Sequence, residues 1–420
     1  MRTTCIALLI SLASSLCSPA VARPLDPRLQ DKTLLVCYTF SGTDRTCDIA
    51  LDELLRVDGW AGRRVNMDTV PVRGNGQITM TDMADGDTLY CMSFCTLFQE
   101  WQATEEAARV RRSFENVFQL PMPAVPVQLS VELYDFHGNV SSCMSSAVDP
   151  ADILIRHAGS NPAPHMYLLQ NGSPSECIDV AIVAEGYTEE EMGIFHADAR
   201  AAVDALISHE PFRSMRDRFN FVAVDLASRD SGVSIPGKGL WKDTALQSGF
   251  NTFYSDRYLT TLHLKRLHES LAGIPYEHVI ILANTDNYGG GGIYNSYTLT
   301  TAHHPLFRPV VVHEFGHSFG ALADEYYYDD QYVQYYYPDI EPWEQNITTL
   351  KDFHSKWEDM KGHDGVGLHE GGGYQSKGVW RPCRDCRMKT NKAKGFCPVC
   401  QRAIERVILH SVEACGQVRN

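Results

Sequence analysis

Two histidines four residues apart, with a glutamate directly after the first, constrain the fold of this chain more than any other feature. The stretch "VVHEFGHSFGALADEY" (residues 311–326) contains His313, Glu314 and His317. On a helix, residues i and i+4 lie one turn apart on the same face, so both imidazoles can reach one tetrahedral zinc ion. Glu314 then lies roughly 100° around the helix, near the metal without having to bind it. The pattern predicts a helix that carries a zinc site, with Glu314 as a general base.

A plain core helix is the alternative, because the surrounding residues "RPVVVHEFGHSFGALA" are largely apolar. A histidine pair could simply be buried on such a helix. With 16 histidines in 420 residues, however, chance gives only roughly 0.03 matches to the motif per chain. The metal site is therefore the favoured interpretation.

Gly320 predicts how a third ligand reaches the metal. If the helix continued, Asp324 would lie about 10 Å farther along its axis than His317. A glycine can adopt a positive φ, end the helix and turn the chain back. We therefore expect Asp324 as the third ligand, with Glu325 as the alternative. Alternatively, both acids lie at a solvated helix end or are N-caps of the segment that follows.

The motif His313-Glu314-x-x-His317-x-x-Gly320 resembles that of the metzincin clan of zinc peptidases. That clan usually places its third ligand six residues after the second histidine, whereas Asp324 follows His317 by seven. The longer string, with "VAEGYTEEEMGIFHADA" upstream and "CRMKTNKAKGFCPVCQRAIE" downstream, is similar to the bacterial IgA-peptidase-type zinc metallopeptidases over about residues 160–410. The β-rich region before it resembles the N-terminal domain that often accompanies this family. The resemblance implies a zinc endopeptidase. It does not imply IgA as the substrate, because the family name comes from one member's activity.

A second cluster surrounds Met388, which the resemblance assigns to the tight turn that metzincins place beneath their zinc. Cys383 and Cys386 precede this methionine, and Cys397 and Cys400 follow it. Two C-x-x-C pairs ten residues apart predict either a second, structural zinc site or disulfides. Archaemetzincins, which are distant metzincin relatives, have a four-cysteine zinc site near their methionine. Both interpretations stay open.

Residues 1–22 are predicted to be a signal peptide. Arg2 gives a positive start, an apolar run follows, and Ala20-Val21-Ala22 fits a cleavage site. No later segment is an integral membrane span, so we expect a secreted or periplasmic protein.

Export affects how the cysteines are interpreted. Of 13 cysteines, Cys5 and Cys17 would leave with the signal peptide. In an oxidising compartment most of the others should pair. The short spacings of Cys37/Cys47 and Cys91/Cys95 suit local disulfides.

The rest of the chain predicts two domains, a β-sandwich over residues 23–158 and an α/β zinc-peptidase domain over 159–420. Short alternating runs such as "GQITMTDM" and "VPVQLSVELYDFHGNVSS" indicate strands in the first, with one helix over "TEEAARVRRSFENVF". In the second, the apolar runs "CIDVAIVAEGY", "FNFVAVDL" and "HVIILAN" predict strands that alternate with helical stretches. The clearest helical stretch is 188–212, with Thr188 as its N-cap and Glu191 at the capping-box position. The resemblance implies a metzincin-like mixed sheet beside the histidine helix.

The net charge and the region before the histidine helix indicate what this protein binds. A net charge of −15 without a basic stripe argues against nucleic acid. Ile293–Thr301 is predicted to be a strand after a glycine-rich turn, or else a hairpin with exposed aromatic residues. The resemblance implies that this strand is a sheet edge receiving a protein or peptide substrate. The residues bordering the cleft would be Tyr294, Asn295, Ser296, Tyr297 and Thr298. The sequence does not indicate an oligomeric state.

Together these patterns predict a zinc hydrolase that cuts peptide bonds. The metal would polarise the scissile carbonyl, and Glu314 would take a proton from water and pass it to the leaving amine. Tyr374 could donate a hydrogen bond to the oxyanion, although a structural tyrosine is the commoner case. A non-catalytic zinc-containing adhesin or binding protein, or a zinc amidase or deacetylase, is the alternative. Glu314 argues against a pure binder, which would not need the base.

Overall fold

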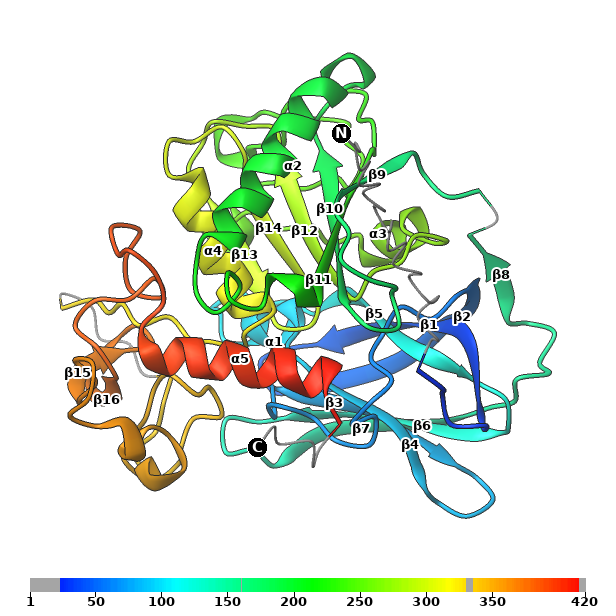
Figure 1. Ribbon diagram of the computed structural model, residues 1–420, viewed down its shortest axis with the longest axis horizontal. Helices are drawn as coiled ribbons and strands as arrows, with labels where there is room; N and C mark the ends of the chain where they lie inside the picture. Colours follow the sequence, from blue (N-terminus) through cyan, green and yellow to red (C-terminus); the bar gives the residue numbers. More distant parts are fainter. Residues whose placement is uncertain (1–22, 160, 330–334, 415–420) are drawn as a thin grey trace, which may run out of the picture.

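The computed structural model describes residues 23–159, 161–329 and 335–414 as a mixed α/β protein whose described strands lie in four sheets (Figure 1). The predicted signal peptide, with Cys5 and Cys17, lies outside these residues. Across the described ranges, no helix is long and apolar enough to cross a membrane.

The N-terminal region consists of two four-stranded sheets that share an apolar core. Their strand orders are β5-β1-β2-β8 and β4-β3-β6-β7. In β6, Leu129, Val131 and Leu133 are buried and alternate with less buried residues, as the sequence pattern predicted. These side chains belong to the same core cluster as Leu34 and Phe40 of β1. The two sheets therefore pack face to face, as expected for a sandwich. The elements are β1 (Leu29–Gly42), β2 (Cys47–Asp58), β3 (Gly76–Asp82), β4 (Thr88–Phe94), α1 (Leu97–Gln102), β5 (Arg112–Pro123), β6 (Val127–Tyr134), β7 (Val140–Val148) and β8 (Arg156–Ala158).

The helix predicted over residues 104–118 is wrong. Helix α1 ends before this stretch, and β5 occupies its second half. β5 pairs antiparallel with β1 along its length, and this register buries Phe114 and Phe118 in the N-terminal core. Helix propensity is a weak preference, and sheet pairing with apolar burial outweighs it here.

The second region is built on one six-stranded sheet of order β13-β14-β12-β10-β11-β9. Its four inner strands run parallel, and β9 and β13 are antiparallel to their neighbours. The predicted capping box starts a 3₁₀ turn, Glu189–Glu191, that leads directly into helix α2. In this box the Thr188 N–H donates to Glu191 Oε2 at 2.9 Å. The elements are β9 (His165–Leu169), β10 (Ile178–Glu185), α2 (Met192–Ile207), β11 (Phe219–Val224), α3 (Leu264–Ser270), β12 (His278–Ala283), β13 (Gly290–Ile293), β14 (Tyr297–Thr301), α4 (Phe307–Ser318), β15 (His369–Gly372), β16 (Gln375–Arg381) and α5 (Pro398–Val412), with 3₁₀ turns η1 (Glu189–Glu191), η2 (Arg216–Arg218), η3 (Pro236–Lys238), η4 (Thr252–Tyr254), η5 (Phe353–Ser355) and η6 (Glu358–Met360).

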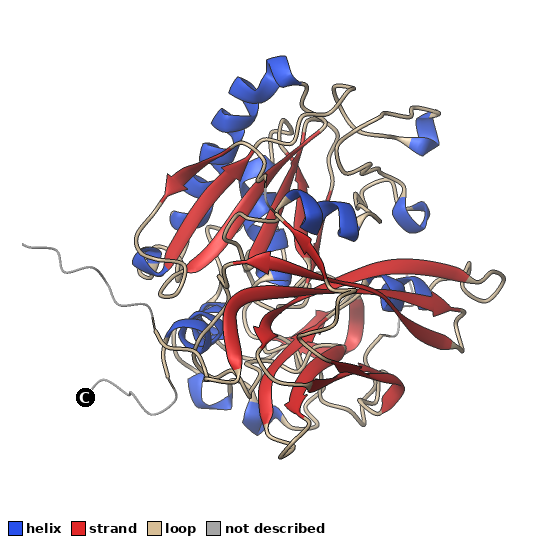
Figure 2. Ribbon diagram, turned by 90° about the vertical axis from the view of Figure 1, so that its right-hand side faces the viewer, coloured by secondary structure: helices blue, strands red, loops and turns tan. Residues whose placement is uncertain are grey.

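The central sheet is covered on both faces, which explains the continuous apolar run of β10. Val180 and Ile182 pack with residues of α2, α4 and α5. Ala181 and Val183, on the other face, belong to the cluster that contains the N-terminal sheets and α3. The two regions accordingly lie against each other (Figure 2). They share one continuous core, while the boundary at residues 158/159 stays a prediction.

Candidate active site

The two motif histidines and Asp324 converge at one buried point. Both histidines lie on α4, as predicted. Asp324 Oδ1 is 3.0 Å from His313 Nε2 and 3.2 Å from His317 Nε2. The two Nε2 atoms are 3.1 Å apart. Asp324 is only 6% exposed, so water does not compete strongly for these atoms.

The other ring nitrogen of each histidine donates to a backbone carbonyl. His313 Nδ1 donates to the Arg387 carbonyl at 2.9 Å, and His317 Nδ1 donates to that of Leu322 at 2.6 Å. Because these bonds hold the protons on Nδ1, the Nε2 lone pairs face each other and the carboxylate. Carbonyl partners of this kind orient metal-binding histidines.

The electrostatics at this point favour a bound cation. Burial lowers the pKa of His317, but the adjacent Asp324 carboxylate raises it to about 9 overall. Burial acts against ionisation of Asp324, yet the two histidines hold its pKa well below the ordinary range. Asp324 Oδ1 has no conventional hydrogen-bond partner among the described residues. Two imidazole nitrogens and one carboxylate oxygen are a ligand set typical of catalytic zinc, so the residues fit this metal.

The chain turns back to the histidines at Ala321, whereas the sequence predicted the turn, with its positive φ, at Gly320. Helix α4 ends at Ser318, and Ala321 has the positive φ, 54°. Gly320 is needed for space. A Cβ there would lie 2.8 Å from the Gly316 carbonyl oxygen and 2.9 Å from Ile404 Cγ1 of α5. The predicted reversal occurs, but its left-handed residue is one position later.

The two acidic candidates for the third ligand point to different places. Glu325 Oε1 accepts from Cys400 Sγ and from Asn346 Nδ2, each at 3.1 Å. Its carboxylate therefore belongs to the cysteine cluster, and Asp324 is the acid that meets the histidines. In this geometry Glu325 does not reach the histidines, and Asp324 stays the predicted third ligand.

Tyr374 is hydrogen-bonded to Asp324. Its hydroxyl donates to Asp324 Oδ2, while the other carboxylate oxygen faces the histidines. The donor proposed for an oxyanion is thus already used by a candidate metal ligand. We interpret Tyr374 as a positioning residue.

Glu314 lies between the histidine cluster and strand β13. A Cβ on Gly290 would lie 3.0 Å from Glu314 Oε1, and one on Gly292 would lie 2.2 Å from the Glu314 carbonyl oxygen. Glycines in β13 thus allow α4 to approach the strand closely. Burial raises the pKa of the Glu314 carboxyl, and the neighbouring histidines oppose that shift.

The predicted strand Ile293–Thr301 is a hairpin. Asn295 has a φ of 51° in the turn between β13 and β14. β14 lies inside the sheet, between β13 and β12, so Tyr294–Thr298 is not the edge. Neither are the aromatic residues exposed, because Tyr294 and Tyr297 are buried. The edge is β13, where the Gly290 N–H already donates to the Arg257 carbonyl at 3.3 Å.

Met388 packs directly against the histidine helix. A Cβ on Gly316 would lie 2.7 Å from Met388 Sδ, and the methionine is fully buried. The Met388 carbonyl accepts the N–H of Glu325 at 2.9 Å. The segment around Met388 thus contacts both α4 and the loop that carries the two acids.

The two disulfides predicted near the N-terminus are wrong. All ten described cysteines are free. Cys91 and Cys95 lie four residues apart along an extended segment at β4, about 13 Å at roughly 3.3 Å per residue. Cys37 pairs with Glu53 across the sheet, whereas Cys47 pairs with Gly42, five residues away from Cys37. Both separations far exceed the reach of a disulfide.

Cys383 lies outside the group that the second cluster forms. Cys386, Cys397, Cys400 and Glu325 each offer a ligand atom within 4.8 Å of the others. Cys383 interacts with Cys397 from outside this group, and its Sγ lies 3.6 Å from the Gly365 carbonyl oxygen. The four cysteines predicted as a set are thus divided, and an acid joins three of them.

Sequence reasoning missed two kinds of contributor. The carbonyls of Leu322 and Arg387 hold the histidine rings, and backbone groups have no sequence signature. The glycines at 290 and 292 allow close packing on α4. Their signal was visible as the run of four glycines before the histidine motif, which suggested only a flexible turn.

Comparison with known families agrees with this arrangement. The model of the family described as IgA Peptidase M64 matches residues 166–364 and 360–408. The model described as Peptidase M64 N-terminus matches residues 25–145. These matches cover the region of the histidine cluster and most of the two N-terminal sheets. No curated protein matches the chain.

Proposed function

The chain belongs to the IgA Peptidase M64 family, and from this premise we propose that it is an exported, zinc-dependent endopeptidase. His313, His317 and Asp324 hold the metal. Glu314 is the general base. The substrate of a peptidase is a protein or peptide, and it is cut here without a covalent acyl-enzyme.

The convergence of three buried ligand atoms carries this proposal. The two Nε2 atoms and Asp324 Oδ1 lie within 3.2 Å of one another. A zinc ion bound by them would polarise the scissile carbonyl and lower the pKa of a water molecule.

The remaining chemistry is assigned to residues of the chain. Glu314 accepts a proton from the attacking water at its carboxylate and then donates it to the leaving amine. Burial raises the pKa of this carboxyl, which suits a group that must both accept and release a proton near neutral pH. Tyr374 holds Asp324 through its second oxygen.

The glycine-rich edge strand supports an extended peptide as the substrate. β13 is the strand next to Glu314, and a sheet edge binds an extended chain through backbone hydrogen bonds. Arg257 to Leu259 already lie against Gly290 and Gly291 of β13. We therefore place the pairing with substrate at the end of the strand, at Gly292 and Ile293.

The proposal is tested by mapping the new N-termini that the protein creates in a complex protein mixture that includes immunoglobulins. Glu314→Ala is the matched control, since it removes the base and keeps the three ligands. We expect new termini with the wild type and none with Glu314→Ala, at equal zinc content. Termini that persist in the variant would remove Glu314 from the mechanism. A zinc-loaded wild type that produces none would favour a binding protein or an amidase.

A further inference from the structure

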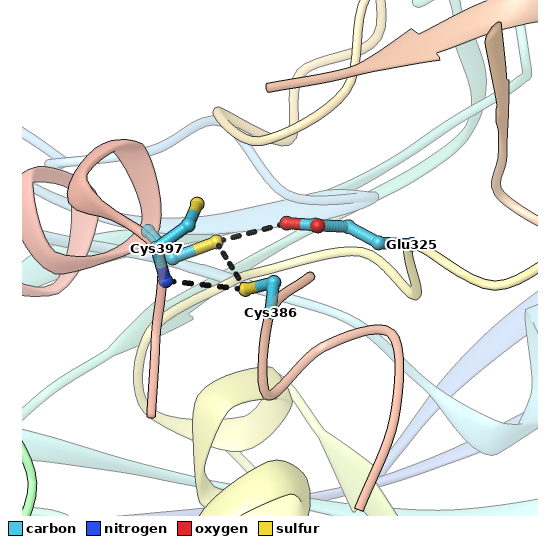
Figure 3. Close-up of side chains that lie close together, drawn as sticks. Glu325, Cys386 and Cys397 are labelled. Atoms are coloured by element: carbon cyan, nitrogen blue, oxygen red, sulfur yellow. Dashed lines mark hydrogen bonds between the residues drawn. The ribbon is translucent and has the colours of Figure 1, made fainter. Parts of the chain in front are cut away.

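Beneath the histidine cluster lies a second buried group of potential metal ligands. Glu325 and Cys386 converge from two loops on the start of α5, where Cys397 is the N-cap residue (Figure 3). Cys386 Sγ is 3.7 Å from Cys400 Sγ, and Cys400 Sγ is 3.1 Å from Glu325 Oε1. The four side chains are buried.

The sulfur atoms are arranged as ligands and do not form a disulfide. A disulfide brings its sulfurs to about 2.05 Å, whereas Cys386 and Cys400 are separated by 3.7 Å. The Cys397 N–H donates to Cys386 Sγ at 3.3 Å, so this sulfur accepts a hydrogen bond as a thiolate does. The start of a helix such as α5 also stabilises thiolates.

Glu325 is the unexpected member of the group. It is fully buried, and its Oε2 has no hydrogen-bond partner among the described residues. A buried carboxylate with an unpartnered oxygen is costly unless a cation compensates it. Thiolates favour zinc, which also accepts carboxylate oxygen in a tetrahedral set.

We propose that these four side chains bind a second Zn²⁺ ion, with Glu325 in place of Cys383 as the fourth ligand. The site is structural, because its four protein ligands leave no open position for a substrate. It does not depend on the peptidase function proposed above.

The backbone connects this site to the histidine cluster by two short segments. Glu325 directly follows Asp324, and the Glu325 N–H donates to the Met388 carbonyl at 2.9 Å. Cys386 directly precedes Arg387, whose carbonyl holds His313. A metal bound by Glu325 and Cys386 would therefore hold Asp324 and Arg387, which both contact the histidines, in place. Its loss should weaken zinc binding by the histidines.

The test counts and identifies metal in the full chain after loading with Zn²⁺ alone. In His313→Ala/His317→Ala, we expect one zinc ion per chain, against two in the wild type. X-ray absorption at the zinc edge of this double variant should show three sulfur ligands and one oxygen. This measurement leaves the cysteines intact, so it does not depend on whether cysteine variants fold.

Two further substitutions in the same background separate the candidate fourth ligands. Glu325→Gln should weaken zinc binding by at least about tenfold, whereas Cys383→Ser should leave it unchanged. Four sulfur ligands, or loss of zinc only with Cys383→Ser, would overturn the role of Glu325. A double variant that folds but binds no zinc would overturn the site itself. So would a thiol count after denaturation in chelator that shows Cys386, Cys397 or Cys400 in a disulfide.

Discussion

Replacing Tyr374 by phenylalanine tests whether this residue positions a metal ligand. The substitution removes the hydroxyl that donates to Asp324 Oδ2 and leaves the ring in place. A hydrogen bond to a charged group contributes about 1.5–3 kcal/mol. At about 1.4 kcal/mol per factor of ten, zinc binding should weaken between about 10- and 100-fold, the usual effect of losing an outer partner of a metal ligand.

Tyr328→Phe is the matched control. Its ring is nearly parallel to that of Tyr374, with centroids 6.3 Å apart. Its hydroxyl accepts from Arg257 at 3.1 Å, and among the described residues no hydrogen bond joins it to Asp324. This variant should therefore bind zinc as the wild type does. Competition with a chromophoric chelator gives the affinity of each protein, and peptide hydrolysis at saturating zinc gives kcat and KM.

The outcome separates two roles for Tyr374. A positioning residue lowers zinc affinity, and activity largely returns when zinc is saturating. If Tyr374→Phe binds zinc as tightly as the control but loses kcat, the hydroxyl acts on the reaction, and the oxyanion role suggested by the sequence would replace our interpretation.

Three further predictions concern packing, pH and the third ligand. Gly292→Ala should lower the free energy of unfolding by about 1–3 kcal/mol, because its Cβ would lie 2.2 Å from the Glu314 carbonyl oxygen and 2.9 Å from His317 Cβ. Gly193→Ala on α2, whose Cβ meets nothing within 4 Å, should be neutral or stabilising in the same urea titration. Burial raises the pKa of Asp179 to about 7, so the folded state binds its proton more tightly, and stability is lost as pH rises from about 4 through 7. Asp179→Asn should reduce this loss by roughly 2–4 kcal/mol between pH 4 and 8, and equal slopes for both proteins would refute the assignment. Asp324→Asn should lose one of two zinc ions on dialysis against a weak chelator, and retention of both would exclude it as a ligand.

The local periodicity of the sequence was enough to place most of the core elements. Alternating apolar residues predicted β6 and its hairpin with β7, and the continuous apolar runs predicted β10, β11 and β12. The capping box predicted the start of the helical segment before α2. These signals are reliable because the period of a strand or helix depends on neighbouring residues only.

Predictions failed where a distant segment decided the outcome. Residues 112–118 became part of β5 because β1 offered a partner strand. The cysteine pairs near the N-terminus looked close in sequence, but extended strands separate them. The sequence predicted Tyr294–Thr298 as the edge of the central sheet, whereas the edge is β13. A turn at Asn295 divides the one predicted strand into two.

The histidine helix can be predicted from local sequence alone, since the spacing of His313 and His317 places both rings on one face of any helix they form. The same stretch limits the candidates for the third ligand to Asp324 and Glu325. The choice between them depends on packing, because the side chains of adjacent residues point to different neighbours. The contacts of α5 and of the Met388 segment place each acid in its own cluster. Spacing fixes local geometry, whereas contacts between distant segments depend on how the whole chain packs.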